Sequence, residues 1–203
     1  DKEENIWIGT EDGGVNIYNS GNQTYTYLVK DKSNPNSISE NCIKAFLDDK
    51  QGNLWIGTFH GGINVLNLKT GKIRHFRNEP TNPGSLISND VWDFALDTAG
   101  CIWVATSSGV DRYNPETGLF THYPNLTDRE RINWIEEDSQ HNIWLGSSNE
   151  IVIFTPENNR MVRYKESSHS FLEDSKGRFW ITTLDAGLVQ YSIDKGPIRY
   201  FGK

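Results

Sequence analysis

The chain has 203 residues and a net charge of −7, with 12% aromatic residues, seven tryptophans and 18 glycines. This acidic balance argues against a nucleic-acid-binding surface, which needs clustered basic side chains, and against adhesion to anionic membranes. No stretch approaches the ~20 apolar residues of a membrane-spanning helix, so we expect no membrane insertion by this segment. Many aromatic residues and glycines joined by short polar stretches favour strands and tight turns over helices.

A motif centred on tryptophan occurs five times along the chain. The tryptophans are Trp7, Trp55, Trp103, Trp144 and Trp180, at spacings of 48, 48, 41 and 36 residues. An aspartate stands six residues before each of them, and these are Asp1, Asp49, Asp97, Asp138 and Asp174. We interpret each aspartate as a turn residue whose side chain accepts backbone N–H groups. We interpret each tryptophan as a structural residue that packs between neighbouring repeats.

In chain order, the predicted elements are short strands separated by turns. In the first two repeats we expect outer strands at 15–18, 25–28, 63–66 and 73–76, with the glycine pairs at 13–14 and 61–62 in hairpin turns. The third repeat shows the full plan, with strands over 91–96, 101–106, 110–113 and 120–123. The last two repeats continue it at 151–154, 161–164, 188–191 and 198–201. The turn at Asn149-Glu150 lacks the glycine pair and is expected to differ.

A four-stranded antiparallel unit repeated at this length predicts an all-β chain of β-propeller blades. The approximate blade ranges are 1–28, 41–77, 89–124, 132–165 and 169–202, within a single segment over 1–203. One blade alone exposes two apolar faces, which stacking against further blades would bury. Because residue 1 falls inside the first blade, we expect a partial segment of a larger propeller. The alternative is a small five-bladed ring with one weak blade.

These residues resemble the two-component regulator propeller repeat. The best matches are Asp49–Gly62 and Asp97–Tyr123, and the linkers 36–41 and 83–91 are also similar. The fourth repeat fits least well, with His141 at the usual glycine. The resemblance implies the periplasmic sensor region of a hybrid two-component histidine kinase, associated with sensing oligosaccharides released from glycans. It also implies two partners, the remainder of the sensor chain and a second copy in a full-length homodimer.

Nothing in the sequence forms a recognisable catalytic motif. There is no nucleophile elbow and no phosphate-binding loop. The acidic runs Glu136-Glu137-Asp138 and Glu173-Asp174 are interpreted as solvated turn charge. We therefore expect no catalytic residue and no enzymatic activity in this segment, and the kinase activity implied by the resemblance belongs to other parts of such proteins.

The histidines and cysteines do not have the spacing of a metal site. His75 and His122 occupy equivalent positions in outer strands and are expected to be solvated. Cys42 and Cys101 lie in different repeats and are interpreted as separate, half-buried thiols. We expect no metal ion and no cofactor.

Ligand binding is better supported than catalysis. Alternating strand direction places the turns between second and third strands on the same face as the long loops 29–40, 77–88 and 124–131. Ligand contacts concentrate in loops held by a rigid scaffold. The candidate ligand-binding residues are Phe59, His60, Glu11, Asp12, Trp92, Arg131, Asn149 and Asp185. An aromatic ring beside hydrogen-bonding groups, as at Phe59-His60, suits a sugar, and the structural alternative is packing on a neighbouring loop.

The leading hypothesis is a non-catalytic, ligand-binding sensor segment of a hybrid two-component protein, with an oligosaccharide as ligand. The first alternative is a propeller enzyme acting on glycans as a hydrolase or lyase, because fold does not fix function. A cluster of ionisable groups with strongly shifted pKa values in the central channel would favour it. The second alternative is a scaffold for protein–protein contacts.

Overall fold

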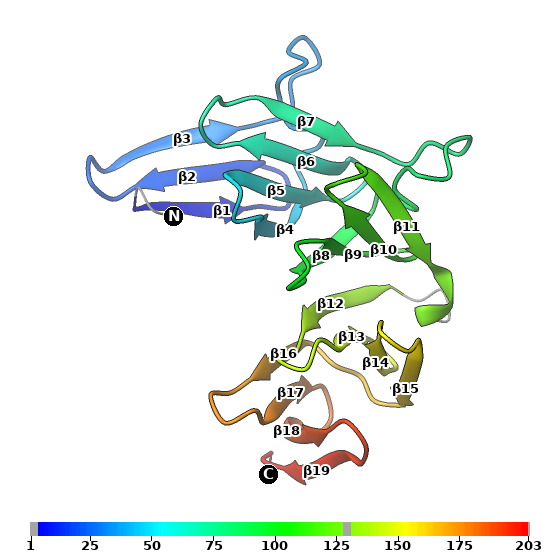
Figure 1. Ribbon diagram of the computed structural model, residues 1–203. Coiled ribbons are helices and arrows are strands. Elements are labelled where there is room, and N and C mark those ends of the chain that lie inside the picture. The colour runs from blue at the N-terminus through cyan, green and yellow to red at the C-terminus, as the bar shows by residue number, and fades with distance from the viewer. Residues whose placement is uncertain (1–3, 128–130, 203) are drawn as a thin grey trace. The chain divides into compact units, whose positions relative to one another are not determined.

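The computed structural model describes residues 4–127 and 131–202, which form nineteen strands and one short 3-10 helix (Figure 1). The strands make five antiparallel sheets, one of three strands and four of four. In every sheet the strands pair in chain order, so each sheet is a simple meander. The predicted all-β arrangement of blade-like sheets is therefore confirmed.

The sheets follow one another along the chain. The first contains β1 (Asn5–Gly9), β2 (Val15–Asn19) and β3 (Thr24–Leu28), and the second contains β4 (Ile43–Asp48), β5 (Asn53–Thr58), β6 (Gly62–Asn67) and β7 (Ile73–Phe76). The third contains β8 (Val91–Leu96), β9 (Ile102–Thr106), β10 (Gly109–Asn114) and β11 (Leu119–Tyr123), and is followed by the 3-10 helix η1 (Pro124–Leu126). The fourth contains β12 (Ile132–Glu137), β13 (Ile143–Ser147), β14 (Ile151–Thr155) and β15 (Arg160–Tyr164). The fifth contains β16 (Ser170–Glu173), β17 (Phe179–Thr183), β18 (Gly187–Ser192) and β19 (Gly196–Tyr200).

The chain divides into two compact units, residues 1–92 and 93–203. In the first unit, buried aliphatic side chains of the first two sheets and of the linker between them form the core, among them Val15, Ile38 and Ile56. The second unit has two buried clusters, one around Trp103 and one around Trp144. Burial of these apolar faces is the main stabilising contribution, at roughly 25 cal/mol per Å².

The repeated aspartate and tryptophan form a hydrogen bond that explains their fixed offset. The indole Nε1–H donates to the aspartate Oδ2 at 3.3 Å for Trp55–Asp49, 3.0 Å for Trp103–Asp97, 2.7 Å for Trp144–Asp138 and 2.9 Å for Trp180–Asp174. The other carboxylate oxygen accepts backbone N–H groups of the turn, such as those of Gln140 and Asn142. Each aspartate thus caps its turn and orients the indole. Asp1 lies outside the described residues.

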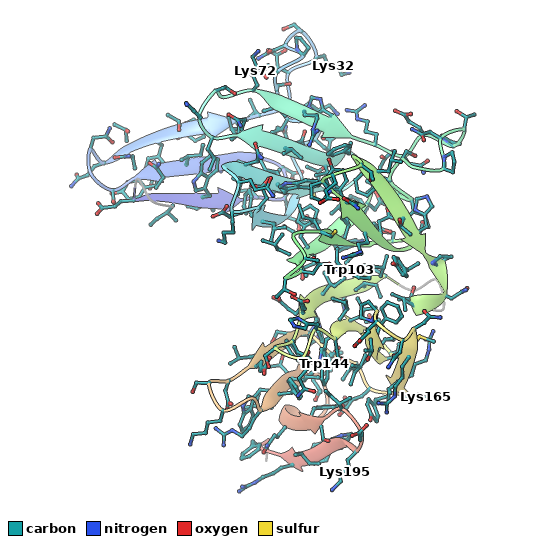
Figure 2. The ribbon with its side chains drawn as sticks, in the orientation of Figure 1. Lys32, Lys72, Trp103, Trp144, Lys165 and Lys195 are labelled. Atoms are coloured by element: carbon teal, nitrogen blue, oxygen red, sulfur yellow. The ribbon has the colours of Figure 1, made fainter. Side chains whose placement is uncertain are left out.

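The repeated tryptophans differ in how deeply they are buried. Trp55, Trp103 and Trp144 are at most 2% exposed, whereas Trp7 and Trp180 are half-buried. In the second unit, the Trp103 ring lies 6.1 Å from Phe154 of the fourth sheet, and Trp144 lies 4.8 Å from Phe179 of the fifth sheet. Both side chains point into the interior of their unit (Figure 2). Each of these two tryptophans therefore packs against the next sheet along the chain.

Apart from the exposed Glu136, the residues of the acidic runs are not solvated turn charge, contrary to expectation. The carboxylate of Glu137 accepts N–H (2.8 Å) and Oγ1–H (3.1 Å) of Thr98, in the turn of the preceding sheet. Glu173 binds Ser139 in the same way, at 2.7 and 2.6 Å. Asp138 is 2% exposed. These side chains tie successive sheets of the second unit together, because the end of each first strand lies beside the preceding turn.

The two equivalent histidines are also not solvated. His122 Nδ1 lies 2.6 Å from Oδ1 of Asp111, a fully buried residue directly opposite it in the strand pairing. His75 lies opposite Asn64, and its Nε2 is 2.9 Å from the Ser37 carbonyl oxygen. Both histidines are half-buried, so the expectation of solvated edge positions is wrong.

Both cysteines are free thiols. Cys42 is half-buried as expected, whereas Cys101 is buried, because it lies just before β9 in the interior of its repeat. Burial raises the pKa of both thiols. Neither is therefore activated as a thiolate nucleophile.

Candidate functional site

The turn between β5 and β6 presents Phe59 and His60 on a rigid frame. His60 has φ 69° and Gly62 has φ 75°, so the chain reverses through left-handed conformations, one of them at a glycine. Asp90 Oδ1 accepts the backbone N–H of His60 at 2.9 Å and lies 2.7 Å from its Nδ1. Gly62 N–H donates to the Asn89 carbonyl at 2.9 Å. The linker before β8 therefore holds the tip of this turn.

Three rings gather next to this turn. The Phe59 ring lies 3.7 Å from the His60 ring and 5.6 Å from the Trp92 ring, measured between centroids. Phe59 and Trp92 are half-buried, whereas His60 is exposed. The structure thus brings together three predicted residues, and it leaves part of their aromatic surface open to solvent.

A cation lies over this aromatic group. Lys44 Nζ is 5.2 Å from the Trp92 ring centroid and 5.9 Å from that of Phe59, within the range of a cation–π interaction. The same ammonium group is 2.7 Å from Glu11 Oε1. The hydrogen bond from Lys44 lowers the pKa of the Glu11 carboxyl and raises that of Lys44 itself. We call Glu11, Lys44, Phe59, His60 and Trp92 the aromatic cluster.

His60 also lines a polar cavity of about 680 Å³. The linker between the first and second sheets forms one wall, and the end of β7 forms another. Its lining includes Ser39, His60, Gly61 and Arg77. Ser37 fixes the linker, because its hydroxyl accepts Asp31 N–H (3.0 Å) and donates to the Asp31 carbonyl (2.9 Å). His60 therefore contributes to both the aromatic cluster and this cavity.

In the second unit, a smaller cavity of about 290 Å³ brings together two more predicted residues, Asn149 and Asp185. They come from the turns between β13 and β14 and between β17 and β18. The remaining lining residues are Ser148, Lys165, Glu166, Ser167 and Thr183. The turns between second and third strands thus lie on the same face of this unit as the linker between the fourth and fifth sheets. Strand direction predicts this placement.

Two predicted residues belong neither to the aromatic cluster nor to either cavity. Asp12 is exposed in the turn between β1 and β2. Arg131 is exposed, and its Nε donates to Asn133 Oδ1 at 3.0 Å. Residues 128–130 of the same loop lie outside the described part of the chain.

Two carboxyl groups of the second unit have strongly raised pKa values. Burial raises the pKa of Asp93 to about 6 and that of Glu136 to about 7, and the nearby Asp93 charge adds to the effect on Glu136. Asp93 Oδ2 accepts the backbone N–H of Ile135 at 3.0 Å, which links β8 to β12. Asp93 is half-buried whereas Glu136 keeps an exposed side chain, so burial acts more strongly on Asp93.

The sequence analysis missed Lys44 and Asp90, both of which shape the aromatic cluster. Lys44 stands five residues before Asp49, and Trp92 stands five residues before Asp97. This shared offset could have shown from the sequence that Lys44 and Trp92 occupy equivalent positions in the first strands of successive repeats. Asp90 gave no such signal, because its partner, the His60 backbone, depends on the turn conformation.

Among residues 4–127 and 131–202, no three His, Cys, Asp or Glu side chains cluster in a way that could hold a metal ion. In the same ranges no helix is long and apolar enough to cross a membrane.

By class, the chain is a run of β-propeller blades, each built on an aspartate–tryptophan turn. Residues 37–60, 85–108 and 125–149 match the two-component regulator propeller. The predicted resemblance is therefore confirmed over these three segments. The matched segments include 125–149, within the repeat that we expected to fit least well. A comparison with curated protein sequences gave no match.

Solved structures with the same fold include two extracellular domains from B. thetaiotaomicron. That of the putative hybrid two-component system BT3049 is 22% identical, with a TM-score of 0.85 over 99% of this chain and 27% of that one. That of the putative one-component system BT4673 is 23% identical, with a TM-score of 0.76 over 99% and 29%. Virginiamycin B lyase from Staphylococcus aureus is 14% identical, with a TM-score of 0.73 over 98% and 66%. The chain thus spans little more than a quarter of the two extracellular domains.

Proposed function

We propose that the chain is a non-catalytic, ligand-binding segment of the periplasmic sensor region of a hybrid two-component protein, and that its ligand is a glycan-derived oligosaccharide. The repeat matches and the likeness to extracellular domains of two-component systems support the sensor assignment. The remainder of the same sensor chain and a second copy in a homodimer would be its partners.

The observation that carries the ligand class is the half-open aromatic cluster beside a polar cavity. Sugars present apolar C–H faces that pack on aromatic rings, and hydroxyl groups that need fixed donors and acceptors. Phe59 and Trp92 offer the rings, while Lys44 and Glu11 offer a donor and an acceptor at their edge. The rigid turn means that little conformational entropy would be lost on binding.

The test is calorimetry of the 203-residue chain against neutral trisaccharides derived from arabinan, galactan, mannan and xylan. We expect at least one to bind, and Trp92→Ala to weaken its affinity at least tenfold. Tyr27→Ala is the matched control, because Tyr27 is an exposed aromatic residue of the same unit on β3 and lies outside the cluster. No binding by any trisaccharide, or equal losses in the two variants, would overturn the proposal.

A second candidate function is glycan cleavage, favoured by the raised pKa values of Asp93 and Glu136. A carboxyl group that stays protonated near neutral pH can act as a general acid. Product release from the same trisaccharides, abolished by Glu136→Gln, would support this candidate. Absence of turnover in the wild-type chain would eliminate it for these substrates and leave the binding proposal intact.

A further inference from the structure

The outer edge of the first sheet is open for a further strand. β3 is the outermost strand of this sheet and pairs with β2 alone among the described residues (Figure 1). The first four of its five residues are exposed, and none of the other outer strands, β7, β11, β15 and β19, is exposed to that extent. The free edge of such a strand presents backbone N–H and C=O groups that can pair with another strand.

The other four outer strands contain residues that discourage such pairing. Arg74 lies in β7, His122 in β11, Arg160 in β15 and Pro197 in β19. Ionisable side chains and proline on an edge strand protect it from pairing with a second chain. β3 has the sequence Thr-Tyr-Thr-Tyr-Leu and contains no residue with an acidic or basic side chain and no proline. Its edge therefore lacks the protection that the other outer strands have.

The absence of charge extends over the whole β2–β3 hairpin. No Asp, Glu, Lys, Arg or His occurs from residue 13 to residue 29, although 23% of the chain is charged. Two copies of a chain with a net charge of −7 repel each other at long range. An uncharged hairpin is therefore a place at which two copies can approach closely.

The sequence of β3 is suited to antiparallel pairing with itself. A two-fold axis at Thr26 places Tyr25 opposite Tyr27 of the second copy, and Tyr27 opposite Tyr25 of the second copy. Tyr25 and Tyr27 lie on the same face of the sheet and are 55% and 61% exposed. Aromatic side chains that lie opposite each other in this way stabilise antiparallel strands. The Tyr18 ring, 4.9 Å from that of Tyr25, extends the aromatic row into β2.

We infer that the outer edge of β3 pairs antiparallel with β3 of a second copy of the chain, about a two-fold axis at Thr26. The two three-stranded sheets then join into one continuous sheet. Backbone hydrogen bonds between the two strands provide the affinity, and the tyrosine pairs fix the register. The pairing uses the edge and leaves both faces of the first sheet free for other contacts. The inference rests on the proposed function in one respect, since it assigns a surface to the homodimer proposed there.

The experiment is sedimentation equilibrium of the 203-residue chain over a concentration series. Five paired residues per copy bury less surface than the ~1,200 Å² of a stable interface, so we expect a reversible dimer with a Kd near ~0.1 mM. Thr26→Glu places two like charges opposite each other at the axis and should raise that Kd at least tenfold. Thr121→Glu is the matched control and should leave the Kd unchanged. Thr121 is an exposed residue of β11, and each threonine lies two strands across from the repeat tryptophan of its sheet, Trp7 or Trp103.

A cross-linking experiment tests the position of the axis without relying on the charged variants. Opposite residues of paired antiparallel strands have β-carbons within about 5.5 Å, which is close enough for a disulfide after small adjustments. Thr26→Cys should therefore form a disulfide-linked dimer under mild oxidation, and Thr121→Cys should not. The wild-type chain gives the background from Cys42 and Cys101, both of which are free thiols.

The outcomes separate this inference from the proposed function. A chain that stays monomeric at ~1 mM, or a dimer that Thr26→Glu and Thr121→Glu weaken equally, overturns the pairing of β3. Large irreversible aggregates in place of a discrete dimer also overturn it, because a two-fold contact closes after two copies. These results leave oligosaccharide binding standing, since calorimetry measures it separately. If no trisaccharide binds and the dimer forms as expected, the oligosaccharide proposal fails and the β3 pairing stands.

Discussion

The second and third sheets share one framework and differ where a ligand could be recognised. In both, an aspartate caps the turn and binds the indole of the tryptophan six residues later. At the same strand pairing, however, the second sheet has Asn64 opposite His75, and the third has Asp111 opposite His122. Asp111 and His122 bind each other, whereas Asn64 keeps an unpaired donor.

The same contrast is seen in the turns. The β5–β6 turn contains Phe59 and His60 and is held from outside by Asp90. The β9–β10 turn is one residue shorter. Its Thr106 Oγ1 donates to the Gly109 carbonyl at 2.8 Å, just as Thr58 Oγ1 donates to the Gly62 carbonyl at 2.8 Å in the β5–β6 turn, so this internal bond is common to both. The third sheet thus pairs the polar groups at these positions internally, whereas the second sheet leaves Asn64 Nδ2 without a partner among the described residues and keeps part of Phe59 exposed. The following predictions test these differences between the second and third sheets.

The largest expected effect is the removal of the framework aspartate of the third sheet. Asp97 accepts from the Cys101 backbone, from the Trp103 indole and from Arg112 Nε (2.9 Å) and Nη2 (2.7 Å). Asp97→Ala leaves a partly buried guanidinium unpaired and should cost about 3–5 kcal/mol. Asp49→Ala removes only neutral donors and should cost about 1–3 kcal/mol. Urea unfolding followed by tryptophan fluorescence measures both.

Arg112 provides the control for this difference. It lies opposite Trp103, where the second sheet places Val65 opposite Trp55. We expect Arg112→Val to reduce the cost of Asp97→Ala toward that of Asp49→Ala, because no cation is then left without its partner. Equal losses for the two aspartate variants in the wild-type background would contradict the idea that the arginine makes the third sheet different.

The repeat explains how much of the fold was predictable from the sequence. The Trp–Asp offset and the turn residues placed the strands, because backbone hydrogen bonding and turn chemistry are local. Their hydrogen bond was not predicted, since it depends on how the turn directs the carboxylate toward the ring. The roles of Glu137 and Glu173 were missed for a related reason. Their partners, Thr98 and Ser139, lie in another sheet.

The candidate site was less predictable. Strand direction placed Asn149 and Asp185 on one face, and the turn-tip argument found Phe59 and His60. That Ser39 Oγ and Asn64 Nδ2 lack a partner among the described residues could not be predicted, because an unpaired donor is recognised only when every neighbouring atom is known. The repeat offset could have identified Lys44 as the residue equivalent to Trp92. Its position over the Trp92 ring could not be predicted, because that depends on how successive first strands lie in space.

The second prediction concerns Asp93, which stands where the second sheet has Ala45, four residues before the turn aspartate. Because its pKa rises to about 6 in the folded chain, the folded state binds the proton more tightly than the unfolded state. Its contribution to stability is therefore fully present below pH ~4 and is lost as pH rises through 6. The shift corresponds to at most about 3 kcal/mol, and we expect about 1–2 kcal/mol because Asp93 is half-buried.

Asp93→Asn removes this titration while keeping an acceptor for the Ile135 N–H. Compared with the wild-type chain, the variant should gain stability between pH 4.5 and pH 7.5, as measured by denaturant midpoints at both values. Glu136→Gln should act in the same direction over a range extending to about pH 7. If the stability of the wild-type chain and of Asp93→Asn changed in parallel with pH, burial would not raise the pKa of the Asp93 carboxyl group.

The smallest expected effect concerns Asp90, which holds the turn that carries His60. Asp90 follows Asn89, just as Cys42 follows Asn41, and each asparagine carbonyl accepts the second glycine N–H of a turn. Of these two linkers, only the one before β8 places a carboxylate, that of Asp90, at this position beside a turn. Because His60 is exposed, Asp90→Ala should cost only about 0.5–1 kcal/mol in a denaturant titration.

The same substitution should broaden or shift the His60 and Gly61 amide resonances, because the turn loses its external anchor. Asp12→Ala is the control, since Asp12 is an exposed aspartate in the corresponding turn of the first sheet. A double-mutant cycle of Asp90→Ala with His60→Ala isolates the coupling between the two side chains. Zero coupling together with unchanged amide resonances would mean that the turn is rigid by itself. External anchoring by Asp90 would then not be what distinguishes the β5–β6 turn from the β9–β10 turn.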